Sequence, residues 1–295
     1  MSDPDPSEKI HIPVMVAEVL DKLGISEHRS ATYVDATVGT GGHALEIVKR
    51  LDSKGLLVGI DVDGEALDIA SGRLKEYNSK VKLYRCSYGR LEELFTQEDL
   101  PRPKGILFDF GLSTLQIEDE KRGFSFTSDG PLDMRMDDRD ETDASDLVNS
   151  LSREKLKEII RKYGEEKWAS RIASSIVEQR ETSPIKRTER LAKIIEDSIP
   201  DRDRYRRGIH PATLTFQALR IAVNDELENI HSGLQQGFDL LIPGGNIVTL
   251  AYHSLEDRIV KRFLKEKKRD CICPPKSPVC RCDKIQEAEL LTDGP

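Results

Sequence analysis

The chain has 295 residues, enough for one large domain or two smaller ones with a sizeable core. Its 53 acidic residues outnumber 45 basic ones and give a net charge of -8, which argues against a protein that grips nucleic acid through bulk positive charge. The chain start lacks the basic and apolar stretches of a signal peptide, and no apolar run approaches the roughly 20 residues of a membrane helix. We therefore expect a cytoplasmic protein without membrane contact.

The first third of the sequence alternates short apolar runs with helical patterns, which is typical of βαβ units around a parallel sheet. The candidate strands are 32–36, 56–61, 82–86 and 105–110. Apolar residues at helical spacing lie between these strands, from 43 to 51 and from 67 to 74. This pattern predicts half of a doubly wound, mostly parallel sheet.

The alternation stops after the fourth candidate strand. Residues 113–136 form a loop-like segment, and residues 151–199 show helical patterns without strands. After Pro211, an amphipathic pattern predicts a single long helix that ends near Leu241, and a buried strand follows at 246–252. The sheet therefore resumes after an interruption.

An interrupted sheet predicts a split domain. We expect residues 1–115 and 210–295 to form one sheet domain, and residues 116–209 to form an inserted helical domain. The fold class is accordingly α/β.

A glycine-rich turn follows the first strand. Gly39, Gly41 and Ala44 fit the G-x-G-x-x-G/A template, in which glycines let the backbone approach a ligand at a helix N-terminus. Asp61 ends the second strand, where a carboxylate can hold both hydroxyls of a ribose. The turn by itself is equally compatible with a purely structural role. It also cannot separate a nicotinamide cofactor from S-adenosylmethionine, because both carry an adenosine.

Two further carboxylates bear on which cofactor binds. Asp35 ends the first strand beside the glycine turn, where it would repel a pyrophosphate but suit the ammonium and sulfonium of S-adenosylmethionine. The alternative is that Asp35 caps the loop through backbone N–H groups. Asp109 ends the fourth strand at the carboxyl edge of the sheet, where such folds bind ligands. Its alternative role is to cap the turn at Gly111.

Several long motifs together resemble one protein family. They are VGTGGHA (38–44), FDFGLSTLQ (108–116), RGFSFTSDGPLDMRMD (122–137), YGEEKWASRIA (163–173), HPATLTFQALRIAVNDEL (210–227) and HSLEDRIVKRF (253–263). Their order and content resemble the bacterial ribosomal RNA small-subunit methyltransferase H family, also called MraW, from His11 to beyond Phe263. The resemblance implies a Rossmann-like class I methyltransferase fold. It also implies S-adenosylmethionine as cofactor and methyl transfer to N4 of a cytidine in the decoding region of 16S ribosomal RNA, within the small ribosomal subunit.

The resemblance also implies a set of cofactor-binding residues. These are Gly41, Gly42, His43, Asp61, Tyr88, Asp109 and Gln116. Position 88 is commonly Phe in the family, and Tyr keeps an aromatic face for the adenine. Family members usually continue into an arginine-rich tail where this chain ends at Pro295, so the resemblance implies a longer protein.

Asp109 is also the candidate catalytic residue. The exocyclic amine of cytosine is a poor nucleophile, because its lone pair is delocalised into the ring. A carboxylate that accepts a hydrogen bond from N4–H would help to localise that pair. Amino-methyltransferases often carry (Asp/Asn)-Pro-Pro-aromatic at this position. This chain has Asp109-Phe110-Gly111-Leu112, so the residue that stacks on the base is unassigned.

Three residues are candidate substrate contacts. His253 and Ser254 follow the last strand, on the same carboxyl edge as Asp109. The alternative is that Ser254 and Asp257 form a capping box that starts a helix. Arg135 lies between two methionines that suit a core, and it is a candidate partner for a phosphate or a carboxylate.

Two basic clusters are candidate RNA-facing patches, with solvated helix faces as the alternative. They are Arg202, Arg204, Arg206 and Arg207, and then Lys261, Arg262, Lys265, Lys267, Lys268 and Arg269. The sequence leaves open whether the chain forms a homodimer.

Four cysteines crowd into one short stretch, C-x-C-x6-C-x-C, at Cys271, Cys273, Cys280 and Cys282. Four thiolates suit a tetrahedral zinc ion, although the usual pair spacing is two to four residues rather than one. The family's chemistry requires no metal. We therefore assign no metal ligand, and zinc binding stays open.

Overall fold

The computed structural model describes residues 13–204, 208–274 and 279–292, and these residues form two compact units. The sheet unit takes the described residues of 1–61, 67–111 and 227–295, and the helical unit takes 62–66 and 112–226. The helical unit is therefore larger than the insertion predicted at 116–209. His11, Arg206 and Arg207, which the sequence singled out, lie outside the described residues. None of the described helices is both long and apolar enough to cross a membrane.

The sheet unit is built on five parallel strands in the order β3-β2-β1-β4-β5. The strands are β1 (Thr32–Asp35), β2 (Leu56–Asp61), β3 (Val81–Arg85), β4 (Gly105–Asp109) and β5 (Asn246–Leu250). The chain order reverses between β1 and β4, whose pairing sets Val34 opposite Ile106. Doubly wound sheets bind ligands at the carboxyl ends of the strands beside such a reversal. The predicted α/β class with a parallel sheet is confirmed.

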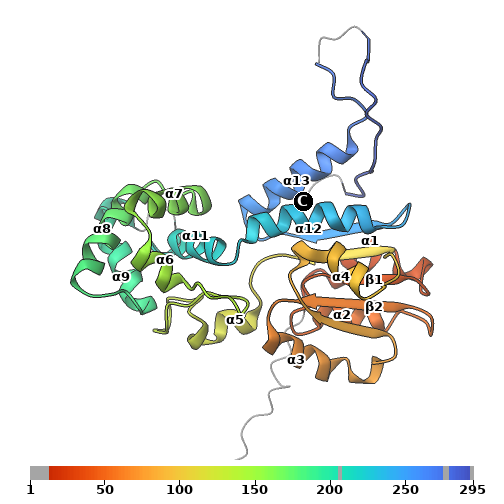
Figure 1. Ribbon diagram of the computed structural model, residues 1–295, viewed down its shortest axis with the longest axis horizontal. Helices are drawn as coiled ribbons and strands as arrows, with labels where there is room; N and C mark the ends of the chain where they lie inside the picture. Colours follow the sequence, from red (N-terminus) through yellow and green to blue (C-terminus); the bar gives the residue numbers. More distant parts are fainter. Residues whose placement is uncertain (1–12, 205–207, 275–278, 293–295) are drawn as a thin grey trace, which may run out of the picture. The chain divides into compact units, whose positions relative to one another are not determined.

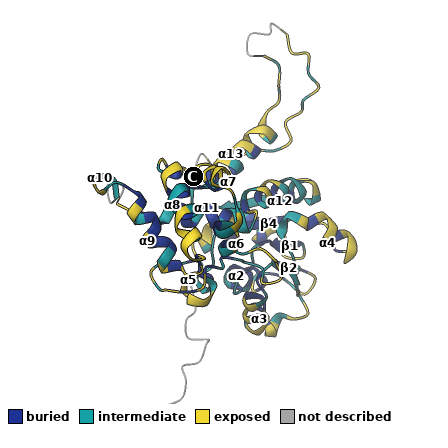
Figure 2. Ribbon diagram, turned by 60° about the vertical axis from the view of Figure 1, so that its left-hand side comes forward, coloured by how far each residue is buried: buried dark blue, intermediate teal, exposed yellow. Residues whose placement is uncertain are grey.

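Helices cover both faces of this sheet (Figure 1). One face carries α1 (Val16–Leu23), η2 (Ile25–Glu27), α2 (Gly42–Val48), α3 (Gly64–Arg73) and η3 (Lys75–Tyr77); the other carries η4 (Tyr88–Arg90), α4 (Leu91–Gln97), α12 (Glu226–Leu240) and α13 (Ser254–Lys268). Alternate residues of each strand serve the two faces, so Tyr33 joins the first core and Val34 the second. The central strands β1, β2 and β4 are largely buried, whereas the outer helix faces are exposed (Figure 2). Burial on both faces explains why the strands are continuous apolar runs in the sequence.

The helical unit has its own hydrophobic core. Its elements are α5 (Thr114–Glu118), η5 (Glu120–Arg122), α6 (Ala144–Ser150), α7 (Arg153–Gly164), α8 (Ala169–Thr182), α9 (Thr188–Ser198), α10 (Asp201–Arg204) and α11 (Thr213–Val223). Gly164 ends α7 directly against α11, where a Cβ would clash with the carbonyl oxygen of Leu214. Met134 lies in this core with no exposed surface, which agrees with the prediction that the methionines beside Arg135 suit a core.

The single helix predicted from Pro211 to Leu241 is wrong, because the structure has two helices there, α11 and α12. Asn224 follows α11, and its side chain accepts a hydrogen bond from the Met136 N–H (2.7 Å) and donates one to the Met134 carbonyl (2.8 Å). Asp225 then adopts a positive φ of 47°. The predicted boundary at 210 is wrong for the same reason, since the division falls at this break and α11 belongs to the helical unit.

Candidate functional site

The glycine turn joins β1 to α2 at the carboxyl edge of the sheet. Gly41 precedes α2 with a φ of +83°, a conformation that L side chains rarely adopt. A Cβ at Gly41 would also lie 3.3 Å from the backbone of Ala70 on α3, so the two helices approach closely here. Gly42 and His43 form the first turn of α2, and His43 is buried. The turn thus has the compact backbone that the template predicts.

Three carboxylates surround this turn, because β1, β2 and β4 all end in aspartate. Asp35 is 1% exposed, and it accepts a hydrogen bond from the Thr37 N–H (3.3 Å). Burial, and then the charge of Asp109, raise the pKa of Asp35 to about 8. Asp61 accepts a hydrogen bond from the Gly39 N–H (2.8 Å). Such a cluster of acids favours a bound cation, because a cation offsets the mutual repulsion of the carboxylates.

Asp109 is contacted by side chains from three segments of the sheet unit: the turn after β1, α2 and the turn after β5. Its Oδ1 accepts a hydrogen bond from the Tyr252 hydroxyl (2.8 Å), and its Oδ2 lies 3.7 Å from His43 Nε2. The Asp109 N–H donates to Thr37 Oγ1 (2.7 Å). Burial, and then the hydrogen bond to Asp109, raise the pKa of Tyr252. The Tyr252 hydroxyl therefore stays protonated at neutral pH. It acts as a hydrogen-bond donor that orients the Asp109 carboxylate.

Tyr252 is a site residue that the sequence analysis missed. The pairing of β4 with β5 sets Asp109 opposite Leu250, so a residue just past β5 emerges at the same edge. This position was the available signal, because parallel strands bring their carboxyl ends together. Tyr252 is 59% exposed although its hydroxyl is bonded, so its ring faces solvent.

Tyr88 lies on η4, directly after β3, and its ring is half-buried. The ring centroid lies 5.9 Å from those of Phe108 and Phe110, in edge-to-face and tilted arrangements. Ser87 caps this turn by accepting the Gly89 N–H (3.1 Å). The aromatic ring predicted for adenine binding is thus fixed by the phenylalanines around the end of β4.

The start of α13 differs from the predicted capping box of Ser254 and Asp257, which is wrong by one residue. His253 is the N-cap, and Glu256 completes the box with His253. Glu256 has no exposed surface and accepts the N–H groups of Tyr252 (2.8 Å) and His253 (3.2 Å). Ser254 is exposed in the first helical turn. Glu256, which the sequence analysis also missed, therefore fixes the turn that carries Tyr252 to Asp109.

Gln116 and Arg135 lie in the helical unit, whereas the other predicted site residues lie in the sheet unit. Gln116 is buried in a capping box with Ser113, and its Nε2 donates to Asp63 (3.0 Å). Arg122 forms an ion pair with the same carboxylate at 2.9 Å. Both the oxygen and the nitrogen of the Gln116 side-chain amide thus form hydrogen bonds within its own unit.

Arg135 forms a forked pair with a neighbouring acid. Its Nε and Nη2 donate to the two carboxylate oxygens of Asp133 at 2.8 and 2.7 Å, and its Nη1 donates to the Asp140 carbonyl at 2.6 Å. A partner phosphate or carboxylate at Arg135 stays a prediction, and it would have to displace Asp133.

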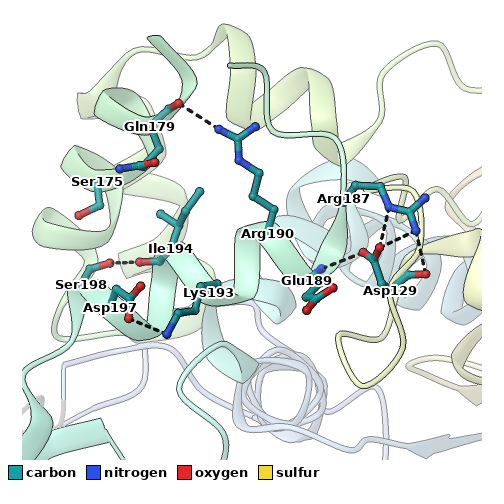
Figure 3. Close-up of a pocket in the computed structure, with 10 residues that line it drawn as sticks. All are labelled: Asp129, Ser175, Gln179, Arg187, Glu189, Arg190, Lys193, Ile194, Asp197 and Ser198. Carbon is teal, nitrogen blue, oxygen red and sulfur yellow. Dashed lines mark hydrogen bonds and ion pairs between the residues drawn. The ribbon is translucent and has the colours of Figure 1, made fainter. Parts of the chain in front are cut away.

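A pocket lies between α8 and α9 of the helical unit (Figure 3). Its lining residues are Asp129, Ser175, Gln179, Arg187, Glu189, Arg190, Lys193, Ile194, Asp197 and Ser198. Four of the charged groups of this pocket bind one another, in the pair of Lys193 with Asp197 (3.0 Å) and the hydrogen bond from Arg187 Nε to Asp129 (2.8 Å). Arg190 donates to the backbone carbonyls of Gln179 and Pro184. Since these charges are already paired, the carboxyl edge of the sheet unit is the better candidate for chemistry.

The parallel sheet of this order has a glycine turn after β1 and acids at the ends of β1, β2 and β4, and it is the sheet of a Rossmann-like class I methyltransferase. The chain belongs to the MraW methylase family, whose model matches residues 8–295. The predicted fold, family and methyltransferase class are thereby confirmed, with S-adenosylmethionine as cofactor.

Curated relatives match along almost the whole chain. A protein named Ribosomal RNA small subunit methyltransferase H from Halothermothrix orenii is 45% identical over 97% of this chain and 90% of its own length. Proteins of the same name from Trichlorobacter lovleyi and Clostridioides difficile are 44% and 42% identical, over 97% of this chain and 90% and 91% of their own lengths.

Proposed function

We propose that this chain methylates N4 of a cytidine in the decoding region of 16S ribosomal RNA, within the small ribosomal subunit. The curated relatives support the ribosomal RNA substrate, since each carries that activity in its name. The observation that carries the proposal is the cluster of Asp35, Asp61 and Asp109 around the glycine turn.

This cluster fits S-adenosylmethionine, which supplies an electrophilic methyl group on a cationic sulfur. Asp35 is buried and opposed by the charges of Asp109 and Asp61, so a cation beside it favours its ionised form. A dinucleotide pyrophosphate would instead add negative charge to an already repulsive site. We assign cofactor binding to Gly41, Gly42, His43, Asp61, Tyr88, Asp109 and Gln116, as the family resemblance implies.

In this proposal Asp109 accepts a hydrogen bond from the N4–H of the target cytosine. That bond localises the nitrogen lone pair and favours the positive charge that develops on nitrogen. Tyr252 holds one carboxylate oxygen at 2.8 Å, and His43 lies 3.7 Å from the other, so the acceptor is oriented before the base arrives. His253 and Ser254 follow β5 on the same edge and are proposed substrate contacts.

We assign substrate recognition to the helical unit and to local basic surfaces. Arg202 has a side chain that is 84% exposed, and Lys265 and Lys268 are exposed on α13 of the sheet unit. These groups can meet phosphates in spite of the acidic net charge. We also propose a cytoplasmic location, because the proposed ribosomal substrate lies there.

The test is to incubate the purified chain and S-adenosylmethionine with small ribosomal subunits, digest the RNA and map the product by mass spectrometry. We expect one added methyl on one cytidine, at N4, within the decoding region. Methyl on C5 or on a ribose would contradict the N4 assignment. Cofactor binding without transfer to any ribosomal particle would make the chain a binding module instead.

A further inference from the structure

The four cysteines beyond α13 converge on one point. Cys271 and Cys273 lie on the outgoing arm of the C-terminal segment, and Cys280 and Cys282 lie on the returning arm. The four sulfur atoms all lie within 4.8 Å of one another. We propose that these four thiolates bind a single structural zinc ion, a site that the methyl-transfer reaction does not use.

The sulfur spacing fits a tetrahedron around zinc. With zinc–sulfur bonds of about 2.3 Å, tetrahedral geometry separates each pair of sulfurs by about 3.8 Å. In the structure Cys271 Sγ lies 3.5 Å from Cys280 Sγ and 3.7 Å from Cys282 Sγ, and the latter two lie 3.6 Å apart. The separations of these three sulfurs match that geometry, and Cys273 Sγ lies within 4.8 Å of each of them.

The same spacing disfavours the other uses of clustered cysteines. A disulfide needs sulfurs about 2.0 Å apart, and all four residues are free thiols here. An iron–sulfur cluster distributes its thiolates over several irons, which requires a wider spread than these contacts allow. A mononuclear tetrahedral site is therefore the arrangement that fits.

Backbone N–H groups point at the sulfurs as they do around bound thiolates. The Ile272 N–H donates to Cys282 Sγ (3.3 Å), and the Arg281 N–H donates to Cys273 Sγ (3.3 Å). The Cys273 N–H likewise donates to Cys271 Sγ (3.4 Å). Such bonds orient metal ligands and offset their negative charge. The loops of both arms are thus already shaped for charged sulfur.

A bound metal would also stabilise the C-terminal segment, which has little hydrophobic core. Ile272 and Val279 beside the cysteines are 64% and 65% exposed, so little apolar burial stabilises the two arms. The segment leaves α13 and returns to it, where the Glu287 N–H donates to the Lys267 carbonyl (2.9 Å) (Figure 1). Small structures without a core are commonly held by a metal. Four protein ligands leave no open position, so the site is structural rather than catalytic.

Metal content of the full-length chain, purified under reducing conditions, tests the proposal directly. We expect one zinc per chain, and tight binding of one cobalt(II) per chain after zinc removal, with the absorption bands of tetrahedral thiolate coordination. The double variant Cys280→Ser/Cys282→Ser should lose both. Cys86→Ser, which removes the cysteine directly after β3, should keep both.

Binding of S-adenosylmethionine by the double variant shows that it remains folded. Stoichiometric iron, absence of both zinc and cobalt binding from the reduced protein, or metal retained by the double variant would each overturn the zinc site. Trypsin should cleave at Arg281 faster once a chelator has removed the metal. Unchanged cleavage would overturn the structural role.

Discussion

The buried acid Asp35 should make the cofactor-free protein less stable as the pH rises. Its pKa in the folded chain is raised to about 8 from an ordinary value of 3.8, so the folded protein holds this proton more tightly than the unfolded chain. The stability cost is absent below pH 4, grows by about 1.4 kcal/mol per pH unit, and is complete above pH 8. The shift of about 4 units corresponds to roughly 6 kcal/mol.

Asp35→Asn removes this titration while it keeps the side-chain volume and an oxygen that can accept the Thr37 N–H. The neutral amide of Asn also removes the negative charge of Asp35, which is repelled by the negative charge of Asp109. We expect the variant to match the wild type near pH 4 and to exceed it by several kcal/mol at pH 9, in urea unfolding without cofactor. Asp68→Asn, at an exposed position on α3, is the matched control. A difference that stays constant from pH 4 to 9 would refute the reasoning.

Cofactor binding should show the opposite preference at Asp35. A cation beside the carboxyl favours the ionised form, so binding near pH 7 should release a proton. Calorimetric titration in two buffers of different ionisation enthalpy measures this release. Asp35→Asn should bind more weakly and show no buffer dependence. Equal enthalpies for the wild type in both buffers would show that Asp35 does not sense the cofactor charge.

The other predictions concern the remaining site residues. Asp61→Ala should weaken S-adenosylmethionine binding more than tenfold with an unchanged circular dichroism spectrum, and unaltered affinity would remove Asp61 from the ribose site. Asp109→Asn should lower single-turnover methyl transfer by roughly two to three orders of magnitude with little change in RNA affinity, whereas a wild-type rate would make Asp109 a structural cap. Tyr252→Phe should lower the single-turnover rate of methyl transfer by about tenfold with an unchanged KM, because one hydrogen bond to Asp109 is lost. A fall in RNA affinity alone would contradict the orienting role of Tyr252. Arg202→Glu should weaken RNA binding and reduce its salt dependence at constant cofactor affinity, and indifference to both would mean that RNA engages elsewhere.

The sheet was predictable because its signals are local. A strand buried on both faces needs a continuous apolar run, and turn residues bound each run. The candidate strand at 56–61 accordingly matches β2, and the one at 32–36 exceeds β1 by a single residue. Residues at the ends of such parallel strands must share one edge, so the strand pattern alone brings Asp35, Asp61 and Asp109 together.

The break between α11 and α12 was not predictable, because its cause is not local. The amphipathic pattern continues through the break, and Asn224 is tolerated within helices. What ends α11 is a pair of hydrogen bonds of the Asn224 side chain, one accepted from the Met136 N–H and one donated to the Met134 carbonyl, about ninety residues away in sequence. The helix propensity of the residues around Asn224 cannot indicate such a distant partner.

The turn after β5 was misjudged because two capping patterns overlap there. Ser254 with Asp257 fits the usual capping preference, yet the buried carboxylate of Glu256 selects His253 as the N-cap. That choice depends on which face of α13 is buried. The role of Tyr252 was missed because the predicted strand ran to residue 252, whereas β5 ends at Leu250 and leaves Tyr252 at the edge beside Asp109.

Residues 62–66 affect how the protein can be divided. They follow β2 and include the first residues of α3, yet they belong to the helical unit. Four peptide connections therefore join the units rather than two. A fragment cut as 112–226 would leave Asp63 behind, and with it the acceptor of Gln116 and Arg122. A buried amide left without its partner costs about 1–3 kcal/mol. The helical unit therefore cannot be transferred intact as residues 112–226 alone, and a fusion protein that carries it must also supply the segment that holds Asp63.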